Sequence, residues 1–440
     1  MFKAISPFEV EGYKVEENVL EDDGFHVHLI PPEPDACPIC GVIGEVVRNG
    51  KNDIRIADLP VHDKPVTAWV RRQKYRCKAC GSVFRPDLPG IVDGYNMTVR
   101  LYNHIAAESF RQPFKTLAEH LGINPATVRS IFLESLAVRN TAYHPETPNV
   151  LGIDELHMGQ SYVGVVTNIE ENTLIEVLKD RNKDTVVDFL QSLDSPNKVE
   201  VVCMDMWNPY RDAVHTTLPN ASVIVDKFHV VRMANVSLDT IRKKLRSQLS
   251  QKARRVLKND RKLLLKRESE LSPQDILKVS GWLRNFPVLD SAYRTKESFY
   301  AIWDEARDCQ TARDMLCAWR ANIPEDQTEI WYPLVRATKN WEREILNYFR
   351  YGSQYTNATT ESLNNIIRAE NRKGRGYNYE VLRGKLLFGR RHKVQEKRKG
   401  SPFAQRSFEH WLADLAARGH GRPQAERRYI DYGADLLSTE

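Results

Sequence analysis

The 440-residue sequence contains no apolar run of the roughly 18–20 residues that a membrane span requires. Its start, MFKAISPFEV, lacks the apolar core of a secretory signal. Cysteine is scarce: there are seven, and four of them stand in two CxxC pairs. Such pairs suit metal binding in a reducing compartment better than disulfides. We therefore expect no membrane association and a cytoplasmic location, on the nucleoid if the host is bacterial.

No charge of one sign dominates the composition, because the formal net charge is a modest +6. Its placement is more informative. The N-terminal arm EVEGYKVEENVLEDDG is acidic, whereas Lys and Arg crowd into residues 242–267 and 366–399. A single basic run indicates either a solvated helix face or a nucleic-acid surface, and both interpretations stay open. The apolar fraction of 41% and the chain length favour an ordinary globular protein of two to four domains.

The two CxxC pairs predict a zinc site in an N-terminal domain of residues 1–92. Each pair places two thiolates at the tip of a tight turn, and two such turns complete a tetrahedral site. The predicted ligands are Cys37, Cys40, Cys77 and Cys80. Redox-active or unliganded thiols are the alternative. The gap between the pairs is longer than in the most compact zinc ribbons and leaves room for an extra hairpin among the short strands expected here.

Helical periodicity begins near residue 96, and we assign residues 93–142 to a helix-turn-helix DNA-binding domain. PFKTLAEHLGINPATVRSIFLESL reads as helix, Gly-containing turn and helix. Asn124 is a plausible cap, with Pro125 in the first turn of the second helix. That helix would bring Thr127, Arg129 and Ser130 to a major groove. The alternative is an ordinary helical hairpin packed on its neighbours.

Beyond a Pro-containing linker, the pattern predicts strands alternating with helices. The expected elements are strands 150–157, 161–169, 173–180, 199–206 and 222–231, with helices 183–193 and 208–218. This is the element order of the RNase H-like fold, and residues 148–231 would form its first part. An α-helical insertion (232–350), a second part of the core with a basic segment (351–400) and a helical tail (401–440) complete the expected multidomain α/β organisation.

Acidic residues end two of the apolar strands. Asp154 follows the first strand and Asp205 the fourth, and these strands lie side by side in the RNase H-like order. Two carboxylates that close repel each other unless a cation lies between them. Glu361, in a later helical pattern, would supply a third carboxylate. Three carboxylates can hold the two Mg²⁺ ions that activate the attacking oxygen and stabilise the leaving oxygen of a phosphodiester.

Several assignments within this group stay open. Glu370 competes with Glu361 for the third position, and Glu155 and Asp226 compete for the other two. Glu361 is favoured because Thr356, Asn357 and Thr359 offer capping oxygens just before it. His229, three residues after Asp226, is either a structural partner of the second aspartate or a group that orients the scissile phosphate. The basic residues that follow Glu361 suit a loop that tracks a DNA backbone; they include Arg368, Arg372, Lys373 and Arg375.

Three segments carry a resemblance to a known family: VVCMDMWNPYRDAV, IVDKFHVV and TNATTESLNNIIRAENRKGRGY. They are similar to the bacterial insertion-sequence transposases of the ISL-three group, which are DDE transposases. The resemblance covers essentially the whole chain and implies a zinc-binding N-terminus, a helix-turn-helix and an RNase H-like core with a helical insertion. It also implies the Asp154, Asp205 and Glu361 triad, the four-cysteine zinc site, binding to terminal inverted repeats and a homodimer on paired ends.

The leading hypothesis is therefore a transposase that acts on double-stranded DNA, both transposon ends and target. Water and then a liberated 3′-hydroxyl would attack DNA phosphodiesters with Mg²⁺, or with Mn²⁺ in its place. A transposase-derived, sequence-specific DNA-binding regulator without catalysis is the alternative, although an idle core need not keep three carboxylates. A junction or repair nuclease is a third hypothesis. It would have no obvious need for two N-terminal DNA-reading modules.

Overall fold

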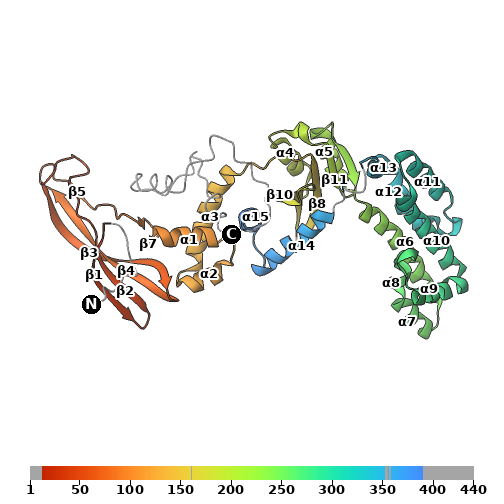
Figure 1. Ribbon diagram of the computed structural model, residues 1–440, viewed down its shortest axis with the longest axis horizontal. Coiled ribbons are helices and arrows are strands. Elements are labelled where there is room, and N and C mark those ends of the chain that lie inside the picture. The colour runs from red at the N-terminus through yellow and green to blue at the C-terminus, as the bar shows by residue number, and fades with distance from the viewer. Residues whose placement is uncertain (1–11, 160, 352–354, 356–357, 390–440) are drawn as a thin grey trace. The chain divides into compact units, whose positions relative to one another are not determined.

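The computed structural model describes residues 12–159, 161–351, 355 and 358–389 (Figure 1). These residues form two compact units, one of residues 12–144 with 370–389 and the other of residues 145–369. The helical tail predicted at 401–440 lies outside the described residues. Over the described ranges, no helix combines the length and the apolar character that crossing a membrane would take.

The first unit begins with a sheet built around one long β-hairpin. Its strands are β1 (Lys14–Glu21), β2 (Gly24–Ile30), β3 (Val46–Val61), β4 (Lys64–Cys77), β5 (Val83–Phe84), β6 (Ile91–Val92) and β7 (Met97–Thr98). They pair in the order β1-β2-β4-β3-β7-β6, with β5 on β4. The β3–β4 hairpin fills the gap between the two cysteine pairs. Strands of 16 and 14 residues replace the short strands expected there.

The hairpin turns at His62 and Asp63, whose φ angles are 51° and 61°. Two successive left-handed residues make the two-residue loop whose twist matches that of the flanking strands. Near the turn, the hairpin packs on β2 through a buried apolar cluster of Val27, Leu29, Ile56, Val66, Ala68 and Val70. The opposite end of the hairpin carries Cys77, which pairs with Val46 in the ladder.

Four helices complete the first unit: α1 (Val99–Glu108), α2 (Phe114–Leu121), α3 (Pro125–Ala142) and α15 (Tyr379–Phe388). Gly122 ends α2 in the left-handed conformation, with φ 66°. Asn124 accepts a hydrogen bond from the Ala126 N–H (2.8 Å), and Pro125 occupies the first helical position. The helix, turn and cap expected around Asn124 are confirmed.

A buried lysine joins α15 to the other helices. Lys385 has no exposed surface, and its ammonium donates to the backbone carbonyls of Ser109 and of Gln112 (2.7 Å). The ammonium also lies 4.6 Å from the centre of the Phe114 ring. Burial lowers the pKa of Lys385 to about 8. One cation therefore satisfies two carbonyls just past the end of α1 and ties them to a helix far along the chain.

Replacing Lys385 with methionine should destabilise the first unit by roughly 2 kcal/mol at pH 7, because two buried carbonyls lose their donor. The folded-state pKa of Lys385 lies below its unfolded value, so the unfolded state binds more protons between about pH 8 and 10.5. The advantage of the wild type over Lys385→Met should therefore grow with pH, by about 2 kcal/mol between pH 7 and 9.5. Urea unfolding of both proteins measures this, and parallel pH profiles would contradict it.

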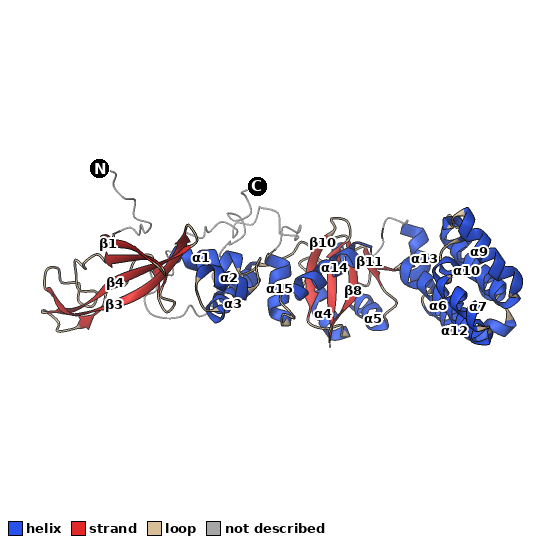
Figure 2. Cartoon of the chain, turned by 90° about the horizontal axis from the view of Figure 1, so that it is seen from below, coloured by secondary structure: helices blue, strands red, loops and turns tan. Residues whose placement is uncertain are grey.

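The second unit contains a five-stranded sheet with helices packed on it (Figure 2). Its elements are β8 (Val150–Met158), β9 (Ser161–Asn168), β10 (Thr173–Leu178), α4 (Lys183–Gln191), η1 (Pro196–Lys198), β11 (Val201–Met204), α5 (Asn208–Thr217) and β12 (Ser222–Val225). The strand order is β10-β9-β8-β11-β12. β8, β9 and β10 run antiparallel, whereas β11 runs parallel to both β8 and β12.

One predicted strand is wrong in its second half. The strand expected at 222–231 ends at Val225, and a helix, α6 (Lys227–Gln248), begins two residues later. The reason is local: the Asp226 carboxylate accepts a hydrogen bond from the Phe228 N–H (3.0 Å) and so caps the helix. His229 consequently lies in the first turn of α6 rather than on a strand.

The helical region continues from α6 to residue 351. It comprises α7 (Gln251–Asn259), α8 (Arg261–Leu265), η2 (Glu268–Glu270), α9 (Pro273–Asn285), α10 (Pro287–Glu305), α11 (Cys309–Ala321), η3 (Glu325–Gln327), α12 (Thr328–Asn340) and α13 (Glu342–Tyr351). We call α6 to α13 the helical insertion. The buried rings of Tyr293, Phe299, Trp319 and Trp331 contribute to its core. A final helix, α14 (Ala358–Lys373), returns to the sheet.

Candidate functional site

The two aspartates singled out from the sequence lie at the same level along two neighbouring strands. Ile153 on β8 pairs with Met204 on β11 in parallel register. Asp205 directly follows β11, as expected, whereas Asp154 lies within β8, which continues to Met158 instead of ending before the aspartate. The two aspartates therefore lie side by side where the pairing of β8 with β11 ends. Asp154 is buried, with 5% of its surface exposed, and Asp205 is half-buried.

The environment of Asp154 penalises its negative charge. Burial and the nearby Asp205 raise the pKa of Asp154 to about 6, against the hydrogen bonds that favour its ionised form. Those bonds come from the Glu155 N–H (2.7 Å) and from the Asn364 side-chain amide (2.6 Å). Two carboxylates held this way gain from a divalent cation, which would relieve both the burial cost and the mutual repulsion.

His229 faces the second aspartate. Its Nδ1 lies 2.7 Å from Asp205 Oδ1 and 3.6 Å from Asp226 Oδ2. Burial lowers the pKa of His229, but the two carboxylates outweigh it and raise the pKa to about 10. Ligand atoms of Asp205, Asp226 and His229 all lie within 4.8 Å of one another. The imidazolium thus neutralises part of the acidic cluster when no metal does.

The rival carboxylates have other partners. Glu155 forms an ion pair with Arg181 (2.7 Å), and the Arg181 guanidinium also stacks over the rings of Tyr162 and Trp207. Asp226 caps α6. Glu155 and Asp226 are therefore engaged in holding local structure, although Asp226 also lies in the cluster with Asp205 and His229. Asp154 is linked to Asp205 through the charge that raises its pKa, while both of its oxygens accept hydrogen bonds.

Helix α14 packs directly on the first strand of this sheet. The Thr360 hydroxyl lies 2.9 Å from the Thr167 hydroxyl on β9, and both residues are fully buried. Gly152 on β8 makes this approach possible: a Cβ there would lie 2.3 Å from Thr167 Oγ1 and 2.8 Å from Thr360 Oγ1. One turn further along α14, Asn364 donates to Asp154. The helix is thus fixed against the part of β8 that carries Asp154.

Glu361 lies in the first turn of α14, exposed, and three residues before Asn364. Residues three apart are neighbours on a helix, so Glu361 lies beside Asn364, at the exposed margin of the buried face of α14. Within the described residues it makes no hydrogen bond or ion pair with Asp154 or Asp205. Of the caps expected before it, Thr356 and Asn357 lie outside the described residues.

Glu370, the rival of Glu361, is buried in the first unit and not in the unit that holds the aspartates. It forms an ion pair with Lys373 of the same helix (3.4 Å). This ion pair gives Glu370 a structural role away from the aspartates.

A cavity of about 640 Å³ opens beside the second aspartate. Asp205, Trp207 and His229 line one end of it, and residues of α6 and α12 line the rest. Trp207 is half-buried and contributes to this wall instead of lying wholly in the core. The helical insertion therefore adjoins the acidic strand ends directly.

The four predicted zinc ligands come together at one end of the hairpin. Their sulfur atoms all lie within 4.8 Å of one another, with Cys37 Sγ 3.8 Å from Cys80 Sγ and Cys40 Sγ 3.7 Å from Cys77 Sγ. Zn–S bonds of about 2.3 Å in a tetrahedron require sulfur atoms about 3.8 Å apart. Gly41 and Gly81 occupy equivalent positions in the two turns, with φ 71° and 72°. The cysteines therefore fit a structural zinc ion.

The predicted DNA-contacting residues are accessible to different degrees. Arg129 and Ser130 on α3 are exposed, and Thr127 is half-buried; the Ser130 hydroxyl accepts a hydrogen bond from the Tyr95 hydroxyl (3.0 Å). The basic residues at the C-terminal end of α14 and in the turn after it are all exposed; they are Arg368, Arg372, Lys373 and Arg375.

Sequence reasoning missed Asn364, Thr360 and Gly152, which fix α14 against the strand that carries Asp154. A signal for Asn364 was present, because it follows Glu361 by three residues and so shares its helix face. No local signal distinguished Gly152, since its importance comes from a helix about 200 residues later in the chain.

Comparison with known proteins agrees with this architecture. Residues 151–386, which span the sheet, the insertion and α14, match the family model DDE_Tnp_ISL3, described as transposase. By class, then, the chain is a transposase. Residues 33–80 match the zinc-finger of transposase IS204/IS1001/IS1096/IS1165, a zinc ribbon. The transposase for insertion sequence element IS1001 of Bordetella parapertussis is 24% identical over 380 residues, covering 83% of this chain and 92% of that protein. The chain belongs to the ISL3 family of transposases, so the resemblance found in the sequence is confirmed.

Proposed function

We propose that this protein is a DNA transposase that binds the terminal inverted repeats of an insertion sequence and catalyses Mg²⁺-dependent strand cleavage and strand transfer. The observation that carries the proposal is the register of Ile153 with Met204, which presents Asp154 and Asp205 side by side. Paired aspartates on adjacent strands suit phosphodiester chemistry with two metal ions. Membership of the transposase family supports the same reaction class.

We also propose that the sheet of the second unit is an RNase H-like core. Its support is the topology: an antiparallel β8-β9-β10 meander extended by β11 and β12 parallel to β8. In this arrangement the first and fourth strands are neighbours, and the proposed catalytic aspartates lie where their pairing ends. Glu361 on α14 is the proposed third carboxylate, because Asn364 of the same helix already contacts Asp154.

We assign the following roles in this reaction to residues of the chain. Asp154, Asp205 and Glu361 would hold the metal ions. Bound Mg²⁺ would activate the attacking oxygen and stabilise the leaving one. Asn364 positions the Asp154 carboxylate. His229 places a positive charge beside Asp205, where it would orient the scissile phosphate.

For DNA recognition we propose α2 and α3 as a helix-turn-helix. Arg129 and Ser130 are exposed near the start of α3, the part of a recognition helix that reads base edges. The exposed basic residues at the end of α14 would contact phosphates and add salt-dependent affinity. Work on two transposon ends at once favours a homodimer.

The test combines the purified protein with labelled duplexes that carry the element's own ends. We expect nicking at the end with Mg²⁺ or Mn²⁺, release of a 3′-hydroxyl, and joining of that end to target DNA. Asp205→Asn is the matched control and should bind the ends while cutting nothing. Binding without cleavage in the wild type would instead identify a regulator. Cleavage that depends on DNA structure and never leads to joining would identify a nuclease.

A further inference from the structure

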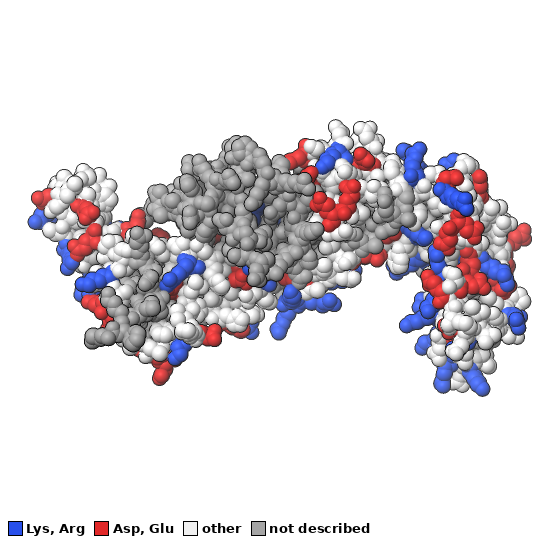
Figure 3. Space-filling model, in the orientation of Figure 1, with Lys and Arg blue, Asp and Glu red and all other residues white. Residues whose placement is uncertain are grey.

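The helical insertion has a strongly uneven distribution of charge. Residues 242–267 contain twelve Lys and Arg and one acidic residue, Asp260, a net charge of +11. The part of the insertion that follows, residues 268–350, contains eleven Lys and Arg and fourteen Asp and Glu, a net charge of −3. Figure 3 shows Lys and Arg side chains at the end of the insertion that carries α7 and α8. Solvation alone does not require the positive charges to be clustered, whereas binding to a polyanion does.

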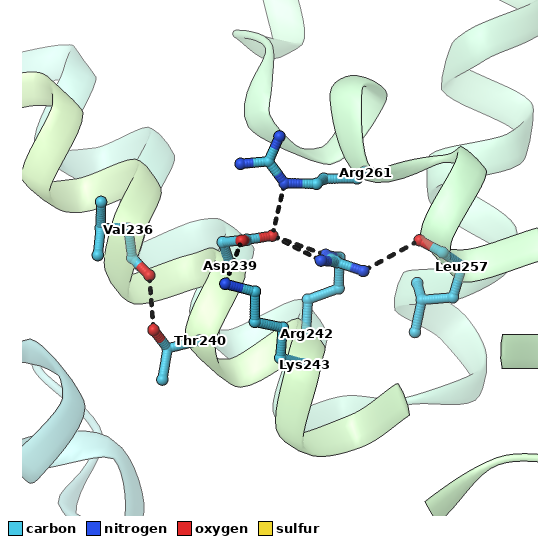
Figure 4. Close-up of polar contacts among 7 residues, drawn as sticks. All are labelled: Val236, Asp239, Thr240, Arg242, Lys243, Leu257 and Arg261. Atoms are coloured by element: carbon cyan, nitrogen blue, oxygen red, sulfur yellow. Dashed lines mark hydrogen bonds and ion pairs between the residues drawn. The ribbon is translucent and has the colours of Figure 1, made fainter. Parts of the chain in front are cut away.

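A buried carboxylate organises this basic region (Figure 4). Asp239 on α6 contacts Arg242 (2.8 Å), Arg261 (3.0 Å) and Lys243 (3.1 Å). Arg242 also donates to the carbonyl of Leu257 at the end of α7 (3.4 Å). One acidic residue thus holds parts of α6, α7 and α8 together, so the cations that it does not bind are carried on a fixed scaffold.

Six further cations in this segment are exposed and have neither an ion pair nor a side-chain hydrogen bond within the described residues: Lys244, Lys252, Arg255, Lys258, Lys262 and Lys266. Lys252, Arg255 and Lys258 are spaced by three, so they lie along one face of α7. Unpaired exposed cations at this density repel one another, and phosphates that bind between them would relieve this electrostatic repulsion.

The basic region is continuous with the proposed catalytic site. Arg232, Val236, Thr240 and Lys244 recur every four residues along α6 and line the same cavity as Asp205 and His229. From His229 to Lys244 the helix advances about 22 Å, the length of roughly six base pairs of duplex. A strip of one helix therefore leads from the acidic strand ends to the basic end of the insertion.

We infer that α6, α7 and α8 form a binding surface for the phosphate backbone of duplex DNA that continues past the scissile phosphate. This inference rests on the proposed function, which places that phosphate at Asp154 and Asp205. The surface would bind backbone and not read bases, because its unpaired groups are flexible lysines and arginines. It would anchor the DNA flank through contacts separate from α3 and from the end of α14.

The test uses the full-length protein and fluorescence anisotropy with end-containing duplexes between 50 and 300 mM salt. The variant combines Lys252→Gln, Arg255→Gln and Lys258→Gln. We expect about tenfold weaker binding at low salt and a log–log salt slope smaller by two to three, since each phosphate contact contributes about 0.9. The ratio of end to random-sequence affinity should stay unchanged.

The matched control removes three exposed cations that have no ion pair within the described residues from other parts of the insertion, with Arg307→Gln, Arg336→Gln and Lys339→Gln. It should change the slope by less than one. Two shortened duplexes are also used, each ending a few base pairs beyond the cut on a different side. With one of the two, the α7 variant and the wild type should bind with equal affinity, because that duplex lacks the DNA flank that α7 contacts. Equal slopes for the two variants would overturn the inference while wild-type cleavage still upheld the transposase. Absence of both binding and cleavage in the wild type would refute the proposed function itself.

Discussion

Replacing Glu361 with glutamine should lower the rate of DNA strand cleavage by at least about 10³-fold, while binding to end DNA stays within about twofold of the wild type. Glutamine keeps the shape and the hydrogen-bonding capacity of the side chain but removes the charge that a metal ion needs. Losing a metal ligand removes stabilisation of the transition state, and each factor of ten costs about 1.4 kcal/mol. Single-turnover cleavage with saturating protein measures the effect.

The decisive comparison is Glu370→Gln, nine residues further along the same helix. Glu370 is buried and paired with Lys373. Its replacement should lower the melting temperature yet leave the cleavage rate, per folded molecule, within about threefold. If Glu370→Gln abolishes cleavage and Glu361→Gln does not, the third carboxylate has been assigned to the wrong turn of α14. Thermal melting of each variant separates folding from chemistry.

Cys77→Ser should abolish zinc binding and melt the cysteine end of the β3–β4 hairpin. Zinc contributes an apparent free energy of about 10–16 kcal/mol in small structural sites. Little else holds this end, because residues 46–53 are exposed or half-buried and the apolar cluster lies nearer the hairpin turn. We expect specific end binding to fall by at least about a hundredfold, with nonspecific binding retained.

Metal analysis and hydrogen exchange across residues 37–84 measure the zinc prediction. Cys317→Ser is the matched control, since Cys317 is an exposed cysteine on α11 that lies far from the cluster in sequence. It should keep one zinc ion per chain and normal protection of the hairpin. A Cys77→Ser protein with unchanged zinc content would refute the site of four thiolates.

The parts of this fold that could be predicted from the sequence are those in which local chemistry suffices. The CxxC pairs specify their own turns, so the cluster of Cys37, Cys40, Cys77 and Cys80 was correctly anticipated. The Asn124 cap follows equally from a short-range signal, whereas the pairing of β8 with β11 was expected from the order of strands and helices along the chain. Asp154 and Asp205 could be named because each ends an apolar run.

The remaining features depend on contacts that no short pattern encodes. The run VIVDKFHVV is apolar on both sides of Asp226, and periodicity cannot separate a long strand from a strand followed by a capped helix. The side-chain bond from Asn364 to Asp154 joins residues 210 apart in the chain. The long hairpin in place of short strands likewise depends on the pairing of β3 with β4. The polar residues of β3 interrupt the apolar pattern from which a long strand could have been predicted.

The gap in sequence between Asp154 and α14 has a consequence for protein synthesis. A nascent polypeptide carries both aspartates once β11 has left the ribosome, but the helix that completes the proposed triad is made about 150 residues later. Truncated translation products would hold an incomplete set of acidic groups and could not nick the chromosome. With the triad proposed above, the order of elements along the chain would confine DNA cleavage to molecules whose translation has passed α14.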